Sequence, residues 1–478
     1  MRLWPRVGLV AAAAFATACV EMRPKAFVDA SAPPAPETRG APAPPPAPPA
    51  QPPAVALPAE AEGAAPQTIT PLQAVDLALR NNPETKRAWL GARAAAAALG
   101  SERSAFYPSV ELDASFLRQK QAALGGKSVF YQTVYGPTAI LNWLLFDFGG
   151  RSADIDEAKL ALNEALFLHD ATLNNVILQV LQAYYGYEGA KALREAQAAS
   201  VKQAEENLRA ADERHRAGVA TIADVLQART VVSQQRLAYQ TVDGQIAVIR
   251  GALATALGIP ANTPVEAGEL PEDLDVDRVT KTVDDLIAQA ERQRPDLAAA
   301  RTRVLAAKAR VSSVRSNALP TLGGAATYGR NYYSGAGAAP HADVYSAGVL
   351  LRIPVFSGFQ KDYDIRKAEE EAAIAEANAA GFEQQVIQEV WSSYYAMKTA
   401  GQKIRTTRDL VASATESAAV TRGRYTAGVG SILDLLTAES ALASARAQDV
   451  LARAEFLFAL AQLARDVGAI EPAVKEAP

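Results

Sequence analysis

The sequence has 478 residues, of which 49% are hydrophobic and 21% charged, and its formal net charge at pH 7 is −4. This balance gives no general attraction to nucleic acid, and there is no basic stripe with interleaved aromatic residues, so we expect no nucleic-acid partner. The single cysteine excludes an internal disulfide and a cysteine-based zinc cluster, and we predict no metal site.

Residues 1–18 have the layout of an export signal. Arg2 and Arg6 precede an apolar stretch over residues 7–16, and small residues follow it. The stretch is shorter than the roughly 20 apolar residues that a membrane-spanning helix needs. We therefore predict a signal peptide over 1–18 and export from the cytoplasm.

Cys19 stands directly after this segment, at the end of the run ATAC. The run resembles a bacterial lipobox, in which the thiol is joined to a diacylglycerol and the cysteine becomes the mature N-terminus. The alternative is an ordinary signal peptide whose cleavage region happens to contain a cysteine. An exported chain without other cysteines has little reason to keep a free thiol there. We predict a covalent lipid on Cys19 and no other cofactor.

The segment that follows the cysteine is rich in proline and alanine. Residues 32–66 show no pattern that would form a hydrophobic core. Such composition is typical of an extended, semi-rigid spacer. We interpret residues 19–66 as a lipidated N-terminus with a linker that holds the anchor away from the folded body.

Beyond residue 67 the sequence is an internal duplication. Gly218 and Gly428 are 210 residues apart, and so are Asp224 and Asp434. Self-similarity at a fixed spacing indicates a repeated structural unit. The predicted repeats cover 67–270 and 271–470, and residues 471–478 remain as a C-terminal tail.

Each repeat opens with a helix-prone segment and continues with extended segments. The helix-prone segments are 82–108 and 294–320, and residues 109–116 then alternate between apolar and polar. A second extended segment is predicted over 131–147 and over 342–357. Aromatic residues lie in these segments: Tyr131, Tyr135, Trp143, Phe146, Tyr345 and Phe356. Outer-membrane barrels use aromatic girdles and strands of about 9–11 residues, but soluble hairpins fit the alternation equally well.

Long helices follow the extended segments. Residues 152–216 and 361–427 contain no proline, and helices of that length imply coiled-coil packing. Apolar residues form a stripe on each helix, which predicts packing rather than ligand binding: Leu166, Leu173, Ile177, Val180, Tyr184 and Tyr187 in the first, and Val386, Ile387, Val390, Tyr394 and Met397 in the second.

A repeated turn interrupts each long helix. RAGVATIADVLQA at 216–228 returns as TAGVGSILDLLTA at 426–438, and a second long helix follows over 222–257 and 432–468. We interpret both turns as tips of helix hairpins, closed by Gly218 and Gly428 in the left-handed conformation.

Each turn also carries a capping pattern for the helix that follows. Thr221 with Asp224, and Ser431 with Asp434, match the spacing of a capping box. We therefore predict that both aspartates cap helices, which leaves room for a further role in lining an aperture.

These features together resemble the TolC-type outer membrane efflux protein family, and with the ATAC run its lipoprotein branch. The resemblance covers about residues 70–470 and rests on the two repeats, the Asn-Pro and Arg-Pro openings, LFDFGGR at 145–151, and the AGV tips followed by DVL and DLL. It implies a mainly α fold with membrane β: a protomer of four transmembrane strands and long coiled-coil hairpins, and a homotrimer with a β-barrel and an α-helical periplasmic tunnel. Four strands cannot close a membrane barrel by themselves, which independently predicts several copies.

The resemblance also implies a function and partners. The chain is predicted to be an outer-membrane exit duct of a Gram-negative bacterium, lipid-anchored and extending into the periplasm, that works with a periplasmic adaptor (membrane fusion) protein and an inner-membrane efflux transporter. Two alternatives stay open: the outer-membrane component of type I protein secretion, and a non-conducting coiled-coil scaffold lipoprotein. The lipoprotein features favour efflux of small molecules.

The family's tip residues contact the adaptor and gate the aperture. The resemblance assigns that role to Gly218, Val219, Asp224, Gly428, Val429 and Asp434, and makes Tyr425 a candidate for a gate bond. Two departures weaken the expected gate network, because Gly430 stands where the family's best-known member has an arginine, and Thr437 where it has an aspartate.

An enzyme is the rival class of function. His169, His215 and His341 are scattered, and the sequence has no HExxH, no GxSxG and no phosphate-cradling glycine loop. We therefore predict no catalytic residues.

Overall fold

The computed structural model describes residues 28, 30, 68–123, 128–277, 279–334 and 340–469. The predicted signal peptide, Cys19, the linker to residue 66 and the tail at 471–478 lie outside the described residues. The chain forms two compact units. The first contains Gly91–Leu166 and Ala299–Gly381 together with residues 28 and 30, and the second contains residues 68–90, Phe167–Ala298 and residues from Phe382 onward. Four helices run along the chain from one unit into the other: α4 (Pro83–Ser104), α5 (Gly150–Arg216), α8 (Pro295–Ser316) and α9 (Gln360–Thr426).

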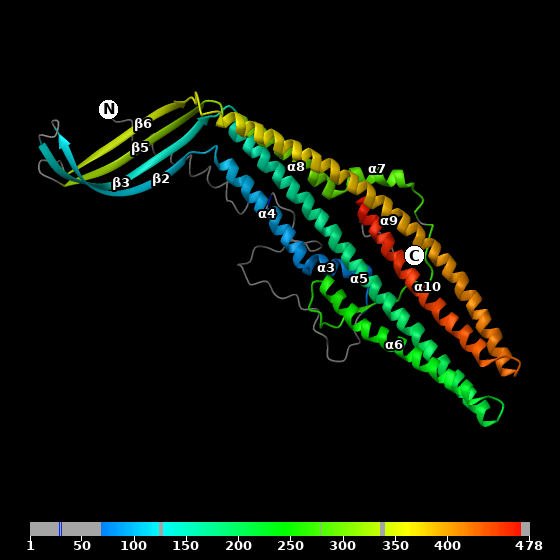
Figure 1. The fold of residues 1–478 in the computed structure, drawn as a ribbon. Helices are drawn as coiled ribbons and strands as arrows, with labels where there is room; N and C mark the ends of the chain where they lie inside the picture. The colour runs from blue at the N-terminus through cyan, green and yellow to red at the C-terminus, as the bar shows by residue number, and fades with distance from the viewer. Residues whose placement is uncertain are drawn as a thin grey trace. The chain divides into compact units, whose positions relative to one another are not determined.

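The first unit contains a four-stranded antiparallel sheet in the order β2-β3-β5-β6 (Figure 1). Its strands are β2 (Ser109–Ala123), β3 (Ser128–Phe146), β5 (Thr321–Ser334) and β6 (His341–Arg352). The central pairing of β3 with β5 joins the two repeats. The four extended segments predicted from the duplication are confirmed, and β2 and β6 are the edges of the described sheet.

The sequence left open whether the extended segments form a membrane barrel or soluble hairpins. The exposure of the apolar side of the sheet distinguishes between the two. Val110, Leu112 and Phe116 alternate along β2 with polar residues, and Leu112 remains 76% exposed. A soluble hairpin would bury this side against a core. The exposed side therefore favours a sheet that meets lipid, as expected for an outer-membrane barrel.

The last extended segment ends earlier than predicted. Strand β6 stops at Arg352, whereas the sequence suggested an extended segment to residue 357. Pro354 has no backbone N–H to donate to a ladder, and its position two residues after Arg352 is consistent with the end of the strand there. Phe356 consequently lies after the strand and not within it.

Both repeats turn from strand to helix with the same unusual backbone. Phe148 and Phe359 have φ angles of 52° and 63°, and a left-handed glycine adjoins each of them. A left-handed non-glycine residue costs roughly 1–2 kcal/mol. Ring contacts help to hold the turns, with centroids 4.8 Å apart for Phe146 and Phe148 and 5.5 Å apart for Phe356 and Phe359.

A buried arginine holds the first of these turns together. The Arg151 guanidinium donates to the carbonyl oxygens of Ala105 at 3.1 Å, Leu144 at 2.7 Å and Leu145 at 3.2 Å. The carboxylate of Asp147 accepts from the Arg151 backbone N–H at 2.7 Å and lies 3.3 Å from its Nε. The cluster therefore donates hydrogen bonds to carbonyl groups at the end of β3 and just after α4.

The helices of the second unit pack around two hydrophobic clusters. It holds α3 (Pro71–Asn81), α6 (Ile222–Ala256), α7 (Val283–Gln293), α10 (Ile432–Val467) and the short parallel pair β1 (Thr68–Ile69) and β4 (Glu266–Ala267). Two core clusters contain most of the predicted stripes, including Ile177, Val180, Tyr184 and Tyr187, and Val386, Val390 and Met397. The interpretation of these stripes as packing is confirmed. No helix within the described ranges has a stretch long and apolar enough to cross a membrane.

Replacing the buried arginine should destabilise the first strand-to-helix turn. Arg151→Ala removes three hydrogen bonds to carbonyl groups and leaves Asp147 without its cation, so we expect a loss of about 3 kcal/mol in the free energy of unfolding. Thermal unfolding in detergent measures this change. Lys361, the equivalent residue of the second repeat, forms no clamp of this kind among the described residues, so Lys361→Ala is the control. Equal losses for the two variants would contradict the role given to Arg151.

Candidate functional site

The two hairpin tips lie in the second unit and have the same backbone. Each runs from the end of one long helix to the start of the next, α5 to α6 and α9 to α10. Gly218 and Gly428 have φ angles of 77° and 78°, as predicted for the left-handed closing residue. The N–H groups of Val219 and Val429 donate back to carbonyl groups five residues earlier, at 2.9 and 3.0 Å. Both glycines therefore close a helix in the same way.

The capping pattern is complete at the first tip and incomplete at the second. The Thr221 hydroxyl accepts from the backbone N–H of Asp224 at 3.3 Å, and the Asp224 carboxylate accepts from the N–H of Thr221 at 2.9 Å. At the second tip the Ser431 hydroxyl accepts from the N–H of Asp434 at 3.1 Å. Within the described residues the Asp434 carboxylate has no hydrogen-bond partner, so the prediction that both aspartates cap is confirmed in full for Asp224 only.

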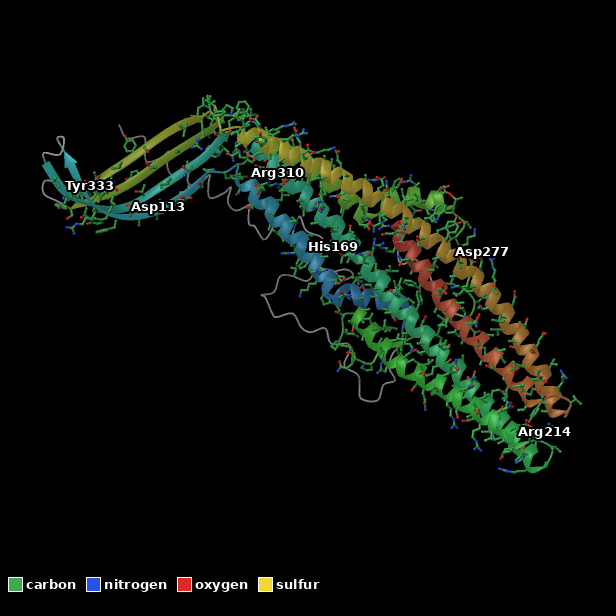
Figure 2. All side chains as sticks on the ribbon, viewed as in Figure 1. Asp113, His169, Arg214, Asp277, Arg310 and Tyr333 are labelled. Carbon is green, nitrogen blue, oxygen red and sulfur yellow. The ribbon has the colours of Figure 1, made fainter. Side chains whose placement is uncertain are left out.

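A cation–π contact joins the two tips. The guanidinium carbon of Arg214, near the end of α5 (Figure 2), lies 4.6 Å from the centroid of the Tyr425 ring. The same guanidinium donates a hydrogen bond to the backbone carbonyl of Tyr425. The structure thus brings the predicted gate candidate Tyr425 onto the first hairpin, through an arginine that sequence reasoning missed. Arg214 and Arg424 are 210 residues apart, a repeat signal that could have found it.

Apolar packing supports this contact from both hairpins. One buried cluster contains Ala211, Val225, Ala228, Tyr425, Ile432, Leu435 and Leu436. Burial raises the pKa of the Tyr425 hydroxyl, and the charge of Asp224 raises it further while Arg214 opposes the shift. The hydroxyl is buried and has no hydrogen-bond partner within the described residues.

The apex of each tip exposes an apolar side chain. Val219 and Val429 are both more than 65% exposed. At the second tip the exposed Val429 and the Asp434 carboxylate, which has no partner within the described residues, give a mixed apolar and acidic surface. The contact between Arg214 and Tyr425 thus joins the two tips, while Val219 and Val429 remain available to a partner.

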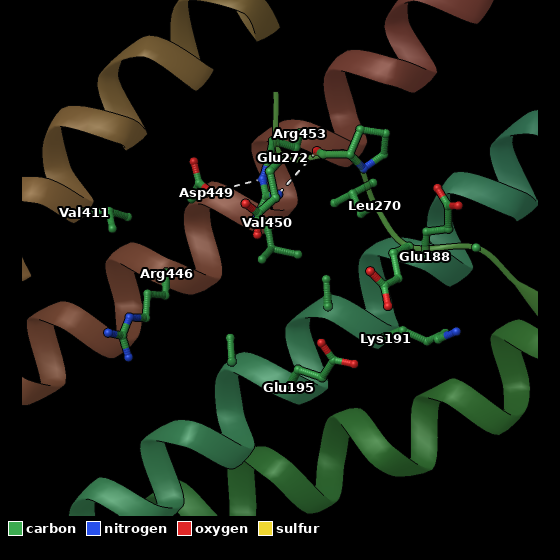
Figure 3. A pocket seen from close by; sticks show the side chains of 15 residues that line it. Glu188, Lys191, Glu195, Leu270, Glu272, Val411, Arg446, Asp449, Val450 and Arg453 are labelled. Carbon is green, nitrogen blue, oxygen red and sulfur yellow. Dashed lines mark hydrogen bonds and ion pairs between the residues drawn. The ribbon is translucent and has the colours of Figure 1, made fainter. Parts of the chain in front are cut away.

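A cavity of about 510 Å³ lies among α5, α10 and the loop after β4 (Figure 3). Its lining includes Glu188, Lys191, Arg446 and Asp449. Glu188 is only 4% exposed, and its Oε2 has no partner among the described residues. Burial raises the pKa of Glu188 to about 7, against the lowering effect of a hydrogen bond with Tyr184 and of the Lys191 charge. Sequence reasoning did not identify this carboxyl group.

Across the part of the chain that the structure describes, neither the tips nor the cavity has the side-chain grouping of a metal centre. The described residues contain no group of three or more His, Cys, Asp or Glu side chains placed to hold a metal ion. Within these residues His169 is buried with its Nδ1 3.1 Å from Asp170, and the Nδ1 of His215 is 3.0 Å from the Ala220 carbonyl oxygen.

Comparison with known proteins gives consistent results over most of the chain. The family model described as outer membrane efflux protein matches residues 74–259 and 286–469. Protein CyaE of Bordetella pertussis is 30% identical over 386 residues, which are 80% of this chain and 81% of that protein. The probable efflux pump outer membrane protein TtgC of Pseudomonas putida is 26% identical over 393 residues, 78% of each chain. The crystal structure of the Campylobacter jejuni CmeC outer membrane channel has the same fold, with a TM-score of 0.74 at 20% identity, over 84% of this chain and 85% of that one.

The two aspartates of the tips should differ in their contribution to stability. Asp224→Ala removes one half of a complete capping box, so we expect the start of α6 to lose about 1 kcal/mol. Asp434→Ala removes a carboxylate without a partner among the described residues, and we expect less than about 0.5 kcal/mol. Hydrogen exchange of the backbone amides at 222–226 and 432–436 measures both effects. Similar changes in exchange at the two tips would refute this distinction.

The buried glutamate should make stability depend on pH. The pKa of Glu188 in the folded chain is about 7, above its ordinary value of 4.5, so folding favours the protonated form. This contribution to stability is complete below pH 4.5 and is lost as the pH rises through about 7. Glu188→Gln should therefore gain on the order of 1–3 kcal/mol relative to wild type between about pH 5 and 8.

The measurement is the thermal unfolding midpoint of both proteins as a function of pH. Glu195→Gln, at an exposed position on the same helix, is the control and should track the wild type. A difference between wild type and Glu188→Gln that is flat across this pH range would show that Glu188 does not titrate there.

Proposed function

The chain belongs to the outer membrane efflux protein family, and we propose that three copies of it form the exit duct of a tripartite efflux system. The observation that carries this proposal is the four-stranded sheet, with its exposed apolar side and with β2 and β6 as its edges. A membrane barrel has no open edge and needs at least about eight strands. Three copies supply twelve strands when β6 of each copy pairs with β2 of the next.

The hairpin tips are the part of the duct that meets the rest of the pump. A trimer has six tips of similar backbone, and each presents an exposed valine, Val219 or Val429. A periplasmic adaptor that docks on six similar tips needs one recognition surface repeated around the axis. The repeated turn with Gly218 and Gly428 supports this role, because both glycines give the tips the same shape.

The gate of the duct uses residues of both tips. The Asp434 carboxylate has no hydrogen-bond partner within the described residues, so three copies would place three carboxylates around the axis. Arg214 and Tyr425 hold the second hairpin against the first and keep the aperture narrow. The contact between Arg214 and Tyr425 takes the place of the family's network of gate bonds. Gly430 and Thr437 cannot form ion pairs in that network, because neither has a charged side chain.

The duct itself performs no chemistry. Channel proteins of this family conduct, and an inner-membrane transporter provides the energy in this proposal. Small molecules are the proposed cargo, supported by the similarity to an efflux pump protein of Pseudomonas putida and by the lipobox-like run that ends at Cys19. A diacylglycerol on Cys19 would tether the mature chain to the outer membrane, since each buried CH₂ contributes about 0.8 kcal/mol.

Mass and conductance of one preparation test the proposal. We expect the detergent-extracted protein to have the mass of a trimer, each chain to carry a lipid, and the preparation to conduct ions in a planar bilayer. Asp434→Ala should leave the trimer intact but weaken block of the channel by divalent cations. A monomer or dimer without conductance would instead support a scaffold lipoprotein, and an unchanged cation block would remove the acidic ring alone.

A further inference from the structure

Within one chain, the first hairpin contacts the second through one surface of each. Each hairpin also carries an exposed surface that is equivalent to the one the other hairpin uses in this contact. We propose that a second copy of this chain covers these surfaces: Arg424 of one copy donates to the backbone carbonyl of His215 in the next. The inference rests on the proposed homotrimer, because a contact of this kind has to continue from copy to copy until the ring closes.

The contact within the chain defines what the two surfaces are. The first hairpin contributes Ala210 and, one helical turn later, Arg214, whose guanidinium lies over the Tyr425 ring. The second hairpin contributes Tyr425, Ile432 and Leu436, which are 5%, 4% and 5% exposed. These five residues form the closed contact, in which one side offers an arginine and the other an aromatic residue with two aliphatic side chains.

The equivalent residues, 210 positions away, are uncovered. Ile222 corresponds to Ile432 and is 56% exposed, and Leu226 corresponds to Leu436 and is 51% exposed. His215 corresponds to Tyr425 and completes this open acceptor surface on the first hairpin. The same hairpin geometry that buries two aliphatic residues on the second tip therefore leaves their equivalents on the first tip in solvent.

The donor side is open as well, on the second hairpin. Arg424 corresponds to Arg214 and is exposed, and it has no hydrogen-bond, ion-pair or ring partner within the described part of the chain. Val420 corresponds to Ala210, lies one turn before Arg424 and is 61% exposed. An apolar residue followed after four positions by an arginine thus occurs on both hairpins, but only the first pair is covered by its own chain.

The hydrogen bonding of the two carbonyl groups matches this arrangement. The Tyr425 carbonyl accepts from the N–H of Gly428 at 3.0 Å and also from Arg214. The His215 carbonyl accepts from the N–H of Gly218 at 2.9 Å, which leaves one lone pair for a second donor. Arg424 of a neighbouring copy supplies that donor, in the position that Arg214 has within one chain.

One substitution distinguishes the contact between copies from the contact within a chain. His215 stands where the second hairpin has Tyr425, so the arginine between copies meets an imidazole in place of a phenol ring. The Nδ1 of His215 is 3.0 Å from the Ala220 carbonyl oxygen, which fixes the orientation of the ring. Tyrosine is among the preferred partners of a cation, so His215→Tyr should strengthen the contact between copies and narrow the closed aperture.

Two matched cysteine pairs test the inference in the full-length, lipidated chain. Arg424→Cys with His215→Cys, treated with a short thiol-to-thiol cross-linker, should give covalent dimers and trimers on denaturing gels. Arg214→Cys with Tyr425→Cys spans the contact within one chain and should give cross-linked monomers only. The parent protein, whose single cysteine is Cys19, is carried through the same treatment as the background control.

The outcomes separate this inference from the proposed function. The inference is wrong if the parent protein has the mass of a trimer and the control pair reacts, but the first pair gives only monomers. The proposed exit duct would not be affected by that result. A monomeric mass for the parent protein would overturn both. If the first pair does not yield folded protein, Val420→Cys with Ile222→Cys probes the same two surfaces and should give the same ladder of covalent dimers and trimers.

Discussion

A backbone group in a membrane has no water to bond with, and this constraint governs the whole chain. A four-stranded sheet with two edges leaves rows of N–H and C=O groups unpaired, which lipid does not tolerate. Each copy of this chain forms such a sheet, with β2 and β6 as its edges. The sheet of one copy therefore requires other copies to pair its edges. The duplication lets one chain supply two similar pairs of strands and two similar hairpins to that assembly.

Duplication provides similar parts, and the differences between the halves assign their roles. The first strand-to-helix turn has the Arg151 clamp, whereas the second has Lys361 at the same place. The first tip uses the carboxylate of Asp224 to cap a helix, whereas Asp434 leaves its carboxylate without a partner among the described residues. The first half thus uses these two groups in local structural contacts, and the second tip keeps a carboxylate that can act at an aperture.

The contact between the tips illustrates how one interface can be used twice. Arg214 and Tyr425 close it within the chain, with apolar residues of both hairpins around them. In a ring of copies, a hairpin of one copy must also pack against a hairpin of the next. Residues equivalent to those of the contact within one chain are available there. Within the described residues of one copy Arg424 has no partner, and the His215 carbonyl has room for a second donor beside the N–H of Gly218.

The sequence alone determined the order of the long helices, the sheet strands and the hairpin turns, because long proline-free runs, turn glycines and alternation each have a local physical cause. Thr221 and Asp224 predicted a capping box correctly, since capping depends on residues three positions apart. The end of β6 was placed too far along the chain, although Pro354 marked its limit. Local chemistry thus predicted the long helices, the sheet strands and the shape of the tips, whereas α3, α7, β1 and β4 were not predicted.

Only the tertiary structure showed which residues meet across long separations in the chain. Arg214 reaches Tyr425 over 211 positions, and no local pattern distinguishes it from Arg424, which remains exposed. The raised pKa of Glu188 likewise comes from burial by segments distant in the sequence. Burial and pairing depend on how separate elements pack, so they were decided by the fold and not by the order of the residues.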